Sequence, residues 1–106
     1  MTNEEILNVK SPKEYVGGPY AVVLKNDVDL WAVVALDWDG TPTLGIRWFN
    51  SEMGSPSSRN YPVWFILPSE THSGIINNVK VPVRVLIEDF LSGKITGEEL
   101  RHKLEL

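Results

Sequence analysis

The stretch RWFNSEMGSPSSRNYPVWF, residues 47–65, combines two arginines with five aromatic residues. Arginine presents planar donors that bind carboxylate or phosphate groups in a bidentate manner, and neighbouring aromatic rings provide a stacking surface. Arginine and tryptophan are also enriched among the residues that dominate the binding energy of protein interfaces. This pattern predicts a binding site for an anionic ligand or a protein partner, formed by Arg47, Trp48, Arg59 and Tyr61.

The same stretch also has a structural interpretation, which its residue types favour. Aromatic side chains in strands usually fill the core, and the two arginines can pair with nearby carboxylates such as Glu52. The polar residues between the aromatic clusters, with Gly54 and Pro56 among them, are typical of a loop. We therefore expect a hairpin first and a binding site within it as the second hypothesis.

Metal ligands are sparse along the chain. His72 and His102 are the only imidazoles, they belong to separate predicted helices, and the chain has no cysteine. Zinc and other transition metals need several such ligands that converge on one point. We therefore expect neither a metal ion nor another cofactor.

Catalytic patterns are equally weak. Ser57 or Ser58 with His72 and Asp37 would supply the residue types of a Ser-His-Asp triad, but no glycine-flanked nucleophile elbow is present. Two carboxylate pairs are better explained as solvated residues of a turn and of a helix face: Asp37 with Asp39, and Glu88 with Asp89. We assign no catalytic residue, and the sequence favours a protein that is not an enzyme.

Composition limits the class of protein and its partners. The chain has 106 residues, 42% of them hydrophobic and 23% charged, which suits one folded domain over residues 1–106. The net charge of −4, without a dense basic cluster, disfavours nucleic-acid binding. An acidic N-terminal segment, the lack of cysteine and the absence of an apolar run of ~20 residues predict a cytoplasmic protein that does not enter a membrane.

The predicted elements give an α+β fold. Segments rich in β-branched and aromatic residues predict four strands at 20–24, 30–36, 43–49 and 61–67. The links between these strands are too short for crossover helices, so the strands form a four-stranded antiparallel meander. Two or three short C-terminal helices should follow and pack on one face of this sheet.

Capping and periodicity locate the helices. At the N-terminus, Asn3 is expected to cap a short helix, and the residues 11–14 carry a second helix start. After Pro68 a short helix is predicted, followed by an amphipathic helix over about 82–91. Alternation over residues 79–87 leaves a fifth strand as an alternative. Thr96 and Glu99 form a capping box for a last helix.

The predicted strands 30–36 and 61–67 are apolar on both sides. In a sheet with one face exposed to water, apolar residues would instead alternate with polar ones. The C-terminal helices can cover one face only. We therefore expect a homodimer that buries the other face through Trp31, Val33, Trp64 and Ile66. The function predicted first is a small acidic, non-catalytic protein-interaction module, and the alternative is an anionic-ligand binding domain or small enzyme that uses the Arg47, Trp48 and Arg59 hairpin.

Overall fold

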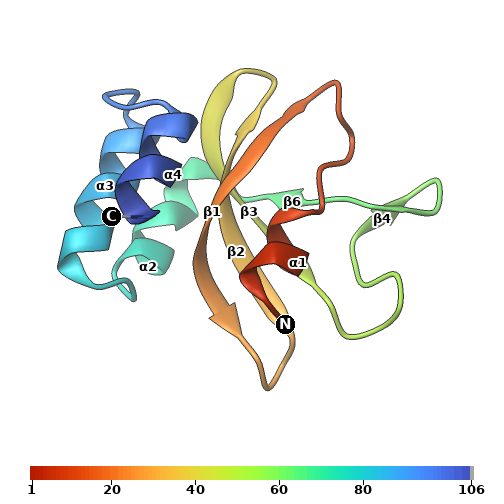
Figure 1. Ribbon diagram of the computed structural model, residues 1–106. Coiled ribbons are helices and arrows are strands. Elements are labelled where there is room, and N and C mark those ends of the chain that lie inside the picture. Colours follow the sequence, from red (N-terminus) through yellow and green to blue (C-terminus); the bar gives the residue numbers. More distant parts are fainter. Residues whose placement is uncertain (106) are drawn as a thin grey trace.

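Four strands form one antiparallel sheet in the order β1-β2-β3-β6, followed by C-terminal helices. A computed structural model describes residues 1–105 of the chain (Figure 1). The strands are β1 (Val16–Asn26), β2 (Trp31–Trp38), β3 (Thr41–Trp48) and β6 (Phe65–Ile66). This arrangement confirms the predicted α+β fold with an antiparallel meander.

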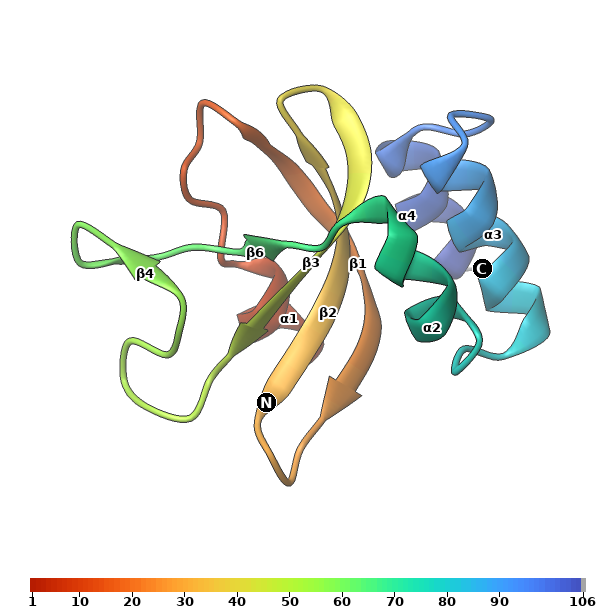
Figure 2. The same ribbon diagram turned by 180° about the vertical axis from the view of Figure 1, so that it is seen from behind.

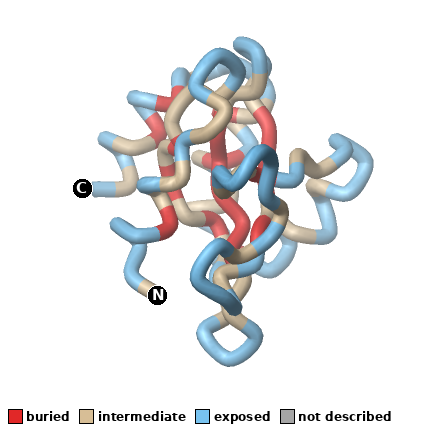
Figure 3. The backbone as a smooth tube through the Cα atoms, turned by 90° about the vertical axis from the view of Figure 1, so that its right-hand side faces the viewer, coloured by how far each residue is buried: buried red, intermediate tan, exposed pale blue. Residues whose placement is uncertain are grey.

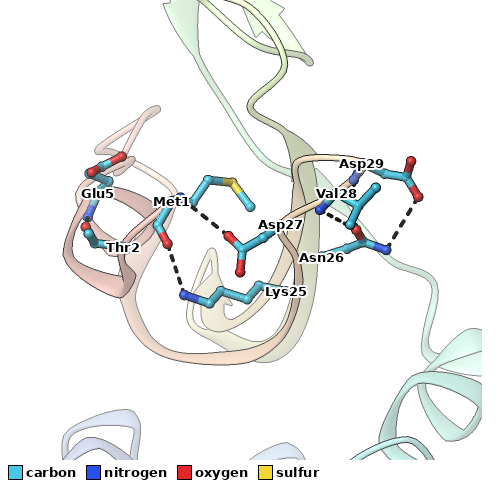
Figure 4. Close-up of polar contacts among 8 residues, drawn as sticks. All are labelled: Met1, Thr2, Glu5, Lys25, Asn26, Asp27, Val28 and Asp29. Atoms are coloured by element: carbon cyan, nitrogen blue, oxygen red, sulfur yellow. Dashed lines mark hydrogen bonds and ion pairs between the residues drawn. The ribbon is translucent and has the colours of Figure 1, made fainter.

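Side chains and backbone conformation define the tight turns between the long strands. The Asn26 side chain accepts hydrogen bonds from the backbone amides of Val28 and Asp29, at 2.9 and 2.8 Å, which closes the β1–β2 turn (Figure 4). Between β2 and β3, Asp39 and Gly40 both have positive φ, which is the conformation of a type I′ turn. Both turns lie in the short links that the sequence predicts between its strands.

The fourth predicted strand, 61–67, is divided in two. Only Phe65–Ile66 pairs with β3, whereas β5 (Tyr61–Pro62) pairs with β4 (Ser57–Ser58) in a separate two-stranded hairpin. Arg59 and Asn60 turn this hairpin with positive φ values of 51° and 67°. Pro62 lacks an amide to donate to a ladder, so a continuous strand through it would lose a hydrogen bond.

Helices follow the sheet as predicted. The 3₁₀ turn η1 (Ser69–Thr71) leads into α2 (His72–Ile76), α3 (Val81–Leu91) and α4 (Gly97–Glu105). The strand alternative for residues 79–87 is wrong, because α3 includes most of them. Thr96 and Glu99 exchange side chain to backbone hydrogen bonds of 3.0 and 3.1 Å, which confirms the capping box at the start of α4.

The N-terminal segment differs from its prediction in two details. The helix α1 (Asn3–Leu7) is capped by Thr2 and not by Asn3, since the Thr2 hydroxyl accepts from the amide of Glu5 at 3.1 Å. Residues 11–14 form a turn instead of a second helix, and Ser11 pairs with Val63 in a parallel bridge. Strand β1 begins at Val16, which leaves too few residues for a stable helix there.

Apolar clusters lie on both faces of the sheet. Between the sheet and the C-terminal helices, Val33, Ala35 and Leu44 pack against Ile87, Phe90 and Leu100. On the opposite face, Ala32, Val34 and Leu36 pack against Ile6 and Trp64. The alternation of β2 side chains between the two faces confirms the prediction that the sheet needs two covers. In the backbone view the buried residues concentrate in the strands (Figure 3).

The second cover comes from the chain itself. Figures 1 and 2 show α2, α3 and α4 on one side of the sheet and α1 on the other. The Trp64 indole donates to the carbonyl of Val9 at 2.8 Å, and Ile6 is fully buried beside it. The first residue is held to the β1–β2 turn, where the Met1 amino group lies 3.4 Å from Asp27 and the Met1 carbonyl accepts from Lys25 at 3.0 Å (Figure 4). The expectation that a partner must supply this cover is therefore corrected.

Candidate functional site

Arg47 is buried and holds the loop that follows β3. One terminal nitrogen donates to the carbonyls of Pro56 and Val63 at 3.0 and 2.8 Å, and the other donates to the carbonyl of Met53 at 2.6 Å. The guanidinium also lies 5.0 Å from the centre of the Phe49 ring. With only 1% of its surface exposed, Arg47 supports the loop from within and does not face a ligand.

Burial of the charged Arg47 guanidinium costs free energy, because the group loses its hydration. Burial lowers the pKa of its guanidinium from the ordinary value, because the charged form loses contact with water. Its Nε has no hydrogen-bond partner within the described residues. Three carbonyl acceptors offset this cost, since hydrogen bonds to a charged donor are stronger than neutral ones.

Gly54 is the residue that lets the loop approach Arg47 so closely. Its φ is +68°, and a Cβ at this position would overlap both the Trp48 carbonyl and the Arg47 guanidinium. Trp48 and Ser55 pair here through backbone hydrogen bonds of 2.7 and 3.0 Å. The polar gap that the sequence marks as a loop is therefore an ordered structure built around Arg47.

Trp48 lies on a different surface, at a corner of the sheet that the helices leave open. Trp31 pairs with Trp48 across β2 and β3, and Ile46 pairs with Phe65 across β3 and β6. Directly paired residues share one face of a sheet, so these side chains are neighbours. We name the surface formed by Trp31, Ile46, Trp48, Phe65 and Leu67 the aromatic corner.

The aromatic corner is accessible and free of charge. The side chains of Phe65 and Trp48 are 56% and 38% exposed. Between them lies a hollow of about 410 Å³, whose lining contains no ionisable residue: Ile46, Trp48, Ser55, Pro56, Phe65 and Leu67. Large aromatic side chains at an uncharged hollow are typical of the centre of a protein interface.

The four residues predicted for a dimer interface do not share one surface. Val33 is fully buried beneath the helices, while Trp64 and Ile66 pack on the opposite face of the sheet, where Trp64 is only 4% exposed. Trp31 lies on the same face as Val33 and belongs to the aromatic corner. Of the four, Trp31 alone contributes to the corner.

Arg59 and Tyr61 line a groove on another part of the molecule. This groove has a volume of about 820 Å³ and lies between the 11–15 segment and the β4–β5 hairpin. Both segments project on the side of the sheet away from the C-terminal helices (Figures 1 and 2). We name it the Arg59 groove. Its lining residues are Ser11, Pro12, Lys13, Glu14, Tyr15, Trp38, Ser58, Arg59, Tyr61, Val63 and Trp64.

Aromatic rings form the walls of the Arg59 groove. Tyr15 and Trp38 stack with their ring centres 5.2 Å apart and their planes 25° from parallel. Tyr15 is 47% and Tyr61 is 64% exposed, so their rings are available for contact. The predicted set of Arg47, Trp48, Arg59 and Tyr61 is thus divided among the loop interior, the aromatic corner and the Arg59 groove.

The residues considered for a catalytic triad are engaged separately. Asp37 accepts a hydrogen bond of 2.7 Å from the Tyr20 hydroxyl, and a ring nitrogen of His72 lies 3.1 Å from the Leu67 carbonyl. No hydrogen bond within residues 1–105 joins either of them to Ser57 or Ser58. The geometry therefore does not assemble a nucleophile with its base.

Tyr20 is the titratable group whose pKa is raised most clearly. Burial is the main cause, followed by the hydrogen bond and charge of Asp37, and together they raise the pKa to about 12. The ring is packed against Phe90, and the Arg101 guanidinium lies over it at 5.4 Å. These contacts join β1 to α3 and α4, which indicates a role in packing.

The described residues give no sign of a metal site. Across residues 1–105, no three His, Asp or Glu side chains are grouped so as to hold a metal ion.

The same range contains no helix with the length and apolar character that crossing a bilayer requires. Comparisons with protein-family models, with curated proteins and with solved structures give no match to this chain.

Proposed function

We propose that this protein is a small, acidic, non-catalytic interaction module that forms a homodimer through the aromatic corner. The observation that carries the proposal is the exposure of Phe65 and Trp48 around an uncharged hollow. The corner differs from the face expected from the sequence, because the N-terminal segment already covers Trp64. It keeps Trp31 and adds Ile46, Trp48, Phe65 and Leu67.

The charge of the protein favours this surface for self-association. Copies with a net charge of −4 repel one another, and the repulsion is least costly where the contact surface holds no charge. Burial of one large apolar side chain contributes about 1.5–3 kcal/mol, and a two-fold contact doubles each contribution. In such a contact the Phe65 ring of each copy fills the hollow of the other.

Sedimentation velocity at micromolar concentration tests the proposal. The wild type should sediment as a dimer, and Phe65→Glu should sediment as a folded monomer, because a carboxylate would be buried without a partner. Val85→Glu is the matched control, since Val85 is 50% exposed on α3 and does not line the corner. A monomeric wild type, or a Phe65→Glu variant that remains dimeric, would show the proposal to be wrong.

A further inference from the structure

We propose that the Arg59 groove binds an extended, acidic, proline-containing segment of a partner protein. This binding site is separate from the homodimer contact, because the residues that line the groove and those that line the aromatic corner are different sets. Three features support it: the aromatic walls, the local charge and the way in which the fold holds the hairpin.

Exposed aromatic walls provide the apolar part of the recognition. Tyr15 and Trp38 form one stacked surface, and Tyr61 stands on the hairpin across the groove. Extended proline-containing segments dock into grooves of this kind, because their rings pack flat against aromatic side chains and their backbone loses little entropy on binding. The polar edges of tyrosine and tryptophan can at the same time donate hydrogen bonds to peptide carbonyls.

Local charge determines which segment fits. Lys13 and Arg59 line the groove against one carboxylate, Glu14, although the whole chain carries a net charge of −4. Within residues 1–105 neither cation takes part in an ion pair. An acidic segment would pair with them, whereas a basic segment would gain only the contact with Glu14.

The hairpin that carries Arg59 and Tyr61 is anchored before any ligand binds. Val63 pairs with Ser11 across the base of the groove, and its carbonyl accepts from Arg47 at 2.8 Å. On the other wall, the Asp39 amide donates to the Tyr15 carbonyl at 2.7 Å. Because the walls are fixed to each other and to the sheet, binding costs little ordering of the protein.

The shape of the groove favours an extended peptide over a compact molecule. Pockets for small molecules enclose most of the ligand, whereas Tyr15 and Tyr61, on two sides of this groove, are about half or more exposed. Single-stranded nucleic acid also stacks on aromatic rings, but two cations neutralise few phosphates and the remaining negative charge opposes the strand. An acidic, proline-containing peptide can pack on the aromatic walls and pair with the two cations of the groove.

Fluorescence anisotropy with three labelled peptides of equal length tests the proposal. The first alternates proline with glutamate, the second replaces glutamate with lysine, and the third replaces proline with glycine. The proline–glutamate peptide should bind at least about tenfold more tightly than either of the others at low salt, and its affinity should fall as salt is added. Equal binding of all three peptides, or no binding, would overturn the inference.

Two charge-reversal variants locate the site. Arg59→Glu should weaken the proline–glutamate peptide by about tenfold and shift the preference toward the lysine peptide. Lys80→Glu reverses one exposed charge at the start of α3, outside the groove, and should leave the affinity unchanged. Circular dichroism confirms that each variant is folded. Equal affinity of Arg59→Glu and wild type would place the peptide elsewhere and contradict the inference.

Competition experiments distinguish an acidic peptide from a small anion or a nucleic acid as the occupant of the groove. Neither inorganic phosphate nor single-stranded oligothymidylate should displace the peptide at equal concentration, and displacement by either would overturn the peptide assignment.

The Phe65→Glu variant should bind the peptide as well as wild type does. Loss of peptide binding in that variant would show that the groove does not act independently of the dimer.

Discussion

Arg47 and Arg59 belong to one short stretch of sequence and have opposite environments. Arg47 is inside the loop with its donors on three backbone carbonyls, while Arg59 stands at the tip of the β4–β5 hairpin beside the groove. The buried arginine fixes the position of the exposed one, because the carbonyl of Val63 connects Arg47 to the base of that hairpin.

This division of roles predicts different effects of the same substitution. Arg47→Met should lower the free energy of unfolding by about 2–4 kcal/mol, since it leaves three partly buried backbone carbonyls without a donor. Arg59→Met should change it by less than about 0.5 kcal/mol, as for most exposed positions. Urea unfolding followed by tryptophan fluorescence measures both. Similar losses for the two variants would contradict the structural role of Arg47.

Tyr20 predicts how stability depends on pH in the alkaline range. Its pKa is raised to about 12 in the folded protein, mainly by burial, against about 10 in an unfolded chain. The folded state therefore holds the proton more tightly, so this stabilisation is complete below pH about 10 and is lost as the pH rises toward 12.

Urea midpoints measured between pH 9 and 12 test this dependence. The wild type should lose stability over this range, and Tyr20→Phe should lose less, because it has no hydroxyl to ionise. Tyr61→Phe, which changes a largely exposed tyrosine, should follow the wild type. A Tyr20→Phe profile parallel to that of the wild type would mean that another group titrates.

At the scale of elements, local signals predict local structure well. The Thr96–Glu99 capping box forms as predicted, and the turn at Asp39 and Gly40 lies in the predicted link between strands 30–36 and 43–49, because each depends on residues only a few positions apart. The faces of β2 also follow from simple alternation. Residues 11–14 fail as a helix, since their capping pattern is not followed by an apolar helical face.

Long-range contacts explain what the sequence leaves undetermined. The indole of Trp64 meets Val9 over a separation of 55 residues, and no periodicity indicates that pairing. The buried role of Arg47 is similar, because its carbonyl partners become neighbours only when the loop closes over it. The sequence therefore predicts that a second cover exists and does not predict which segment provides it.

The helix α1 is the element that this second cover depends on. Ile6 is fully buried against Trp64 and the β2 residues of that face. Ile6→Ala should lower the free energy of unfolding by about 2–5 kcal/mol, the usual cost of truncating a buried isoleucine. Glu4→Ala, at an exposed position of the same helix, should cost far less.

Chemical denaturation measures this difference between the two variants. Tryptophan emission of the folded Ile6→Ala variant should also shift to longer wavelength, because the cover over Trp64 loosens. If Ile6→Ala were as stable as Glu4→Ala, the N-terminal segment would not be a true part of the core.

At the scale of the whole molecule, each side of the sheet has its own cover, and the aromatic corner and the Arg59 groove stay accessible. The C-terminal helices pack on β1, β2 and part of β3 and leave Trp48 and Phe65 exposed at the aromatic corner, while the 11–15 segment and the β4–β5 hairpin form the Arg59 groove. We propose that the protein binds a copy of itself at the aromatic corner and a peptide in the Arg59 groove.

Dimerisation through the aromatic corner predicts that thermal stability depends on protein concentration. Association favours the folded state by mass action, so the melting temperature of the wild type should rise when the concentration is increased a hundredfold. The Phe65→Glu variant should melt at one temperature at all concentrations, because its folded state has no partner to gain. Val85→Glu should follow the wild type, which distinguishes loss of the interface from a general effect of added charge. Differential scanning fluorimetry over this concentration range measures the melting temperatures of all three proteins. A wild-type melting temperature that does not change with concentration would mean that the exposed Phe65 and Trp48 side chains do not mediate self-association.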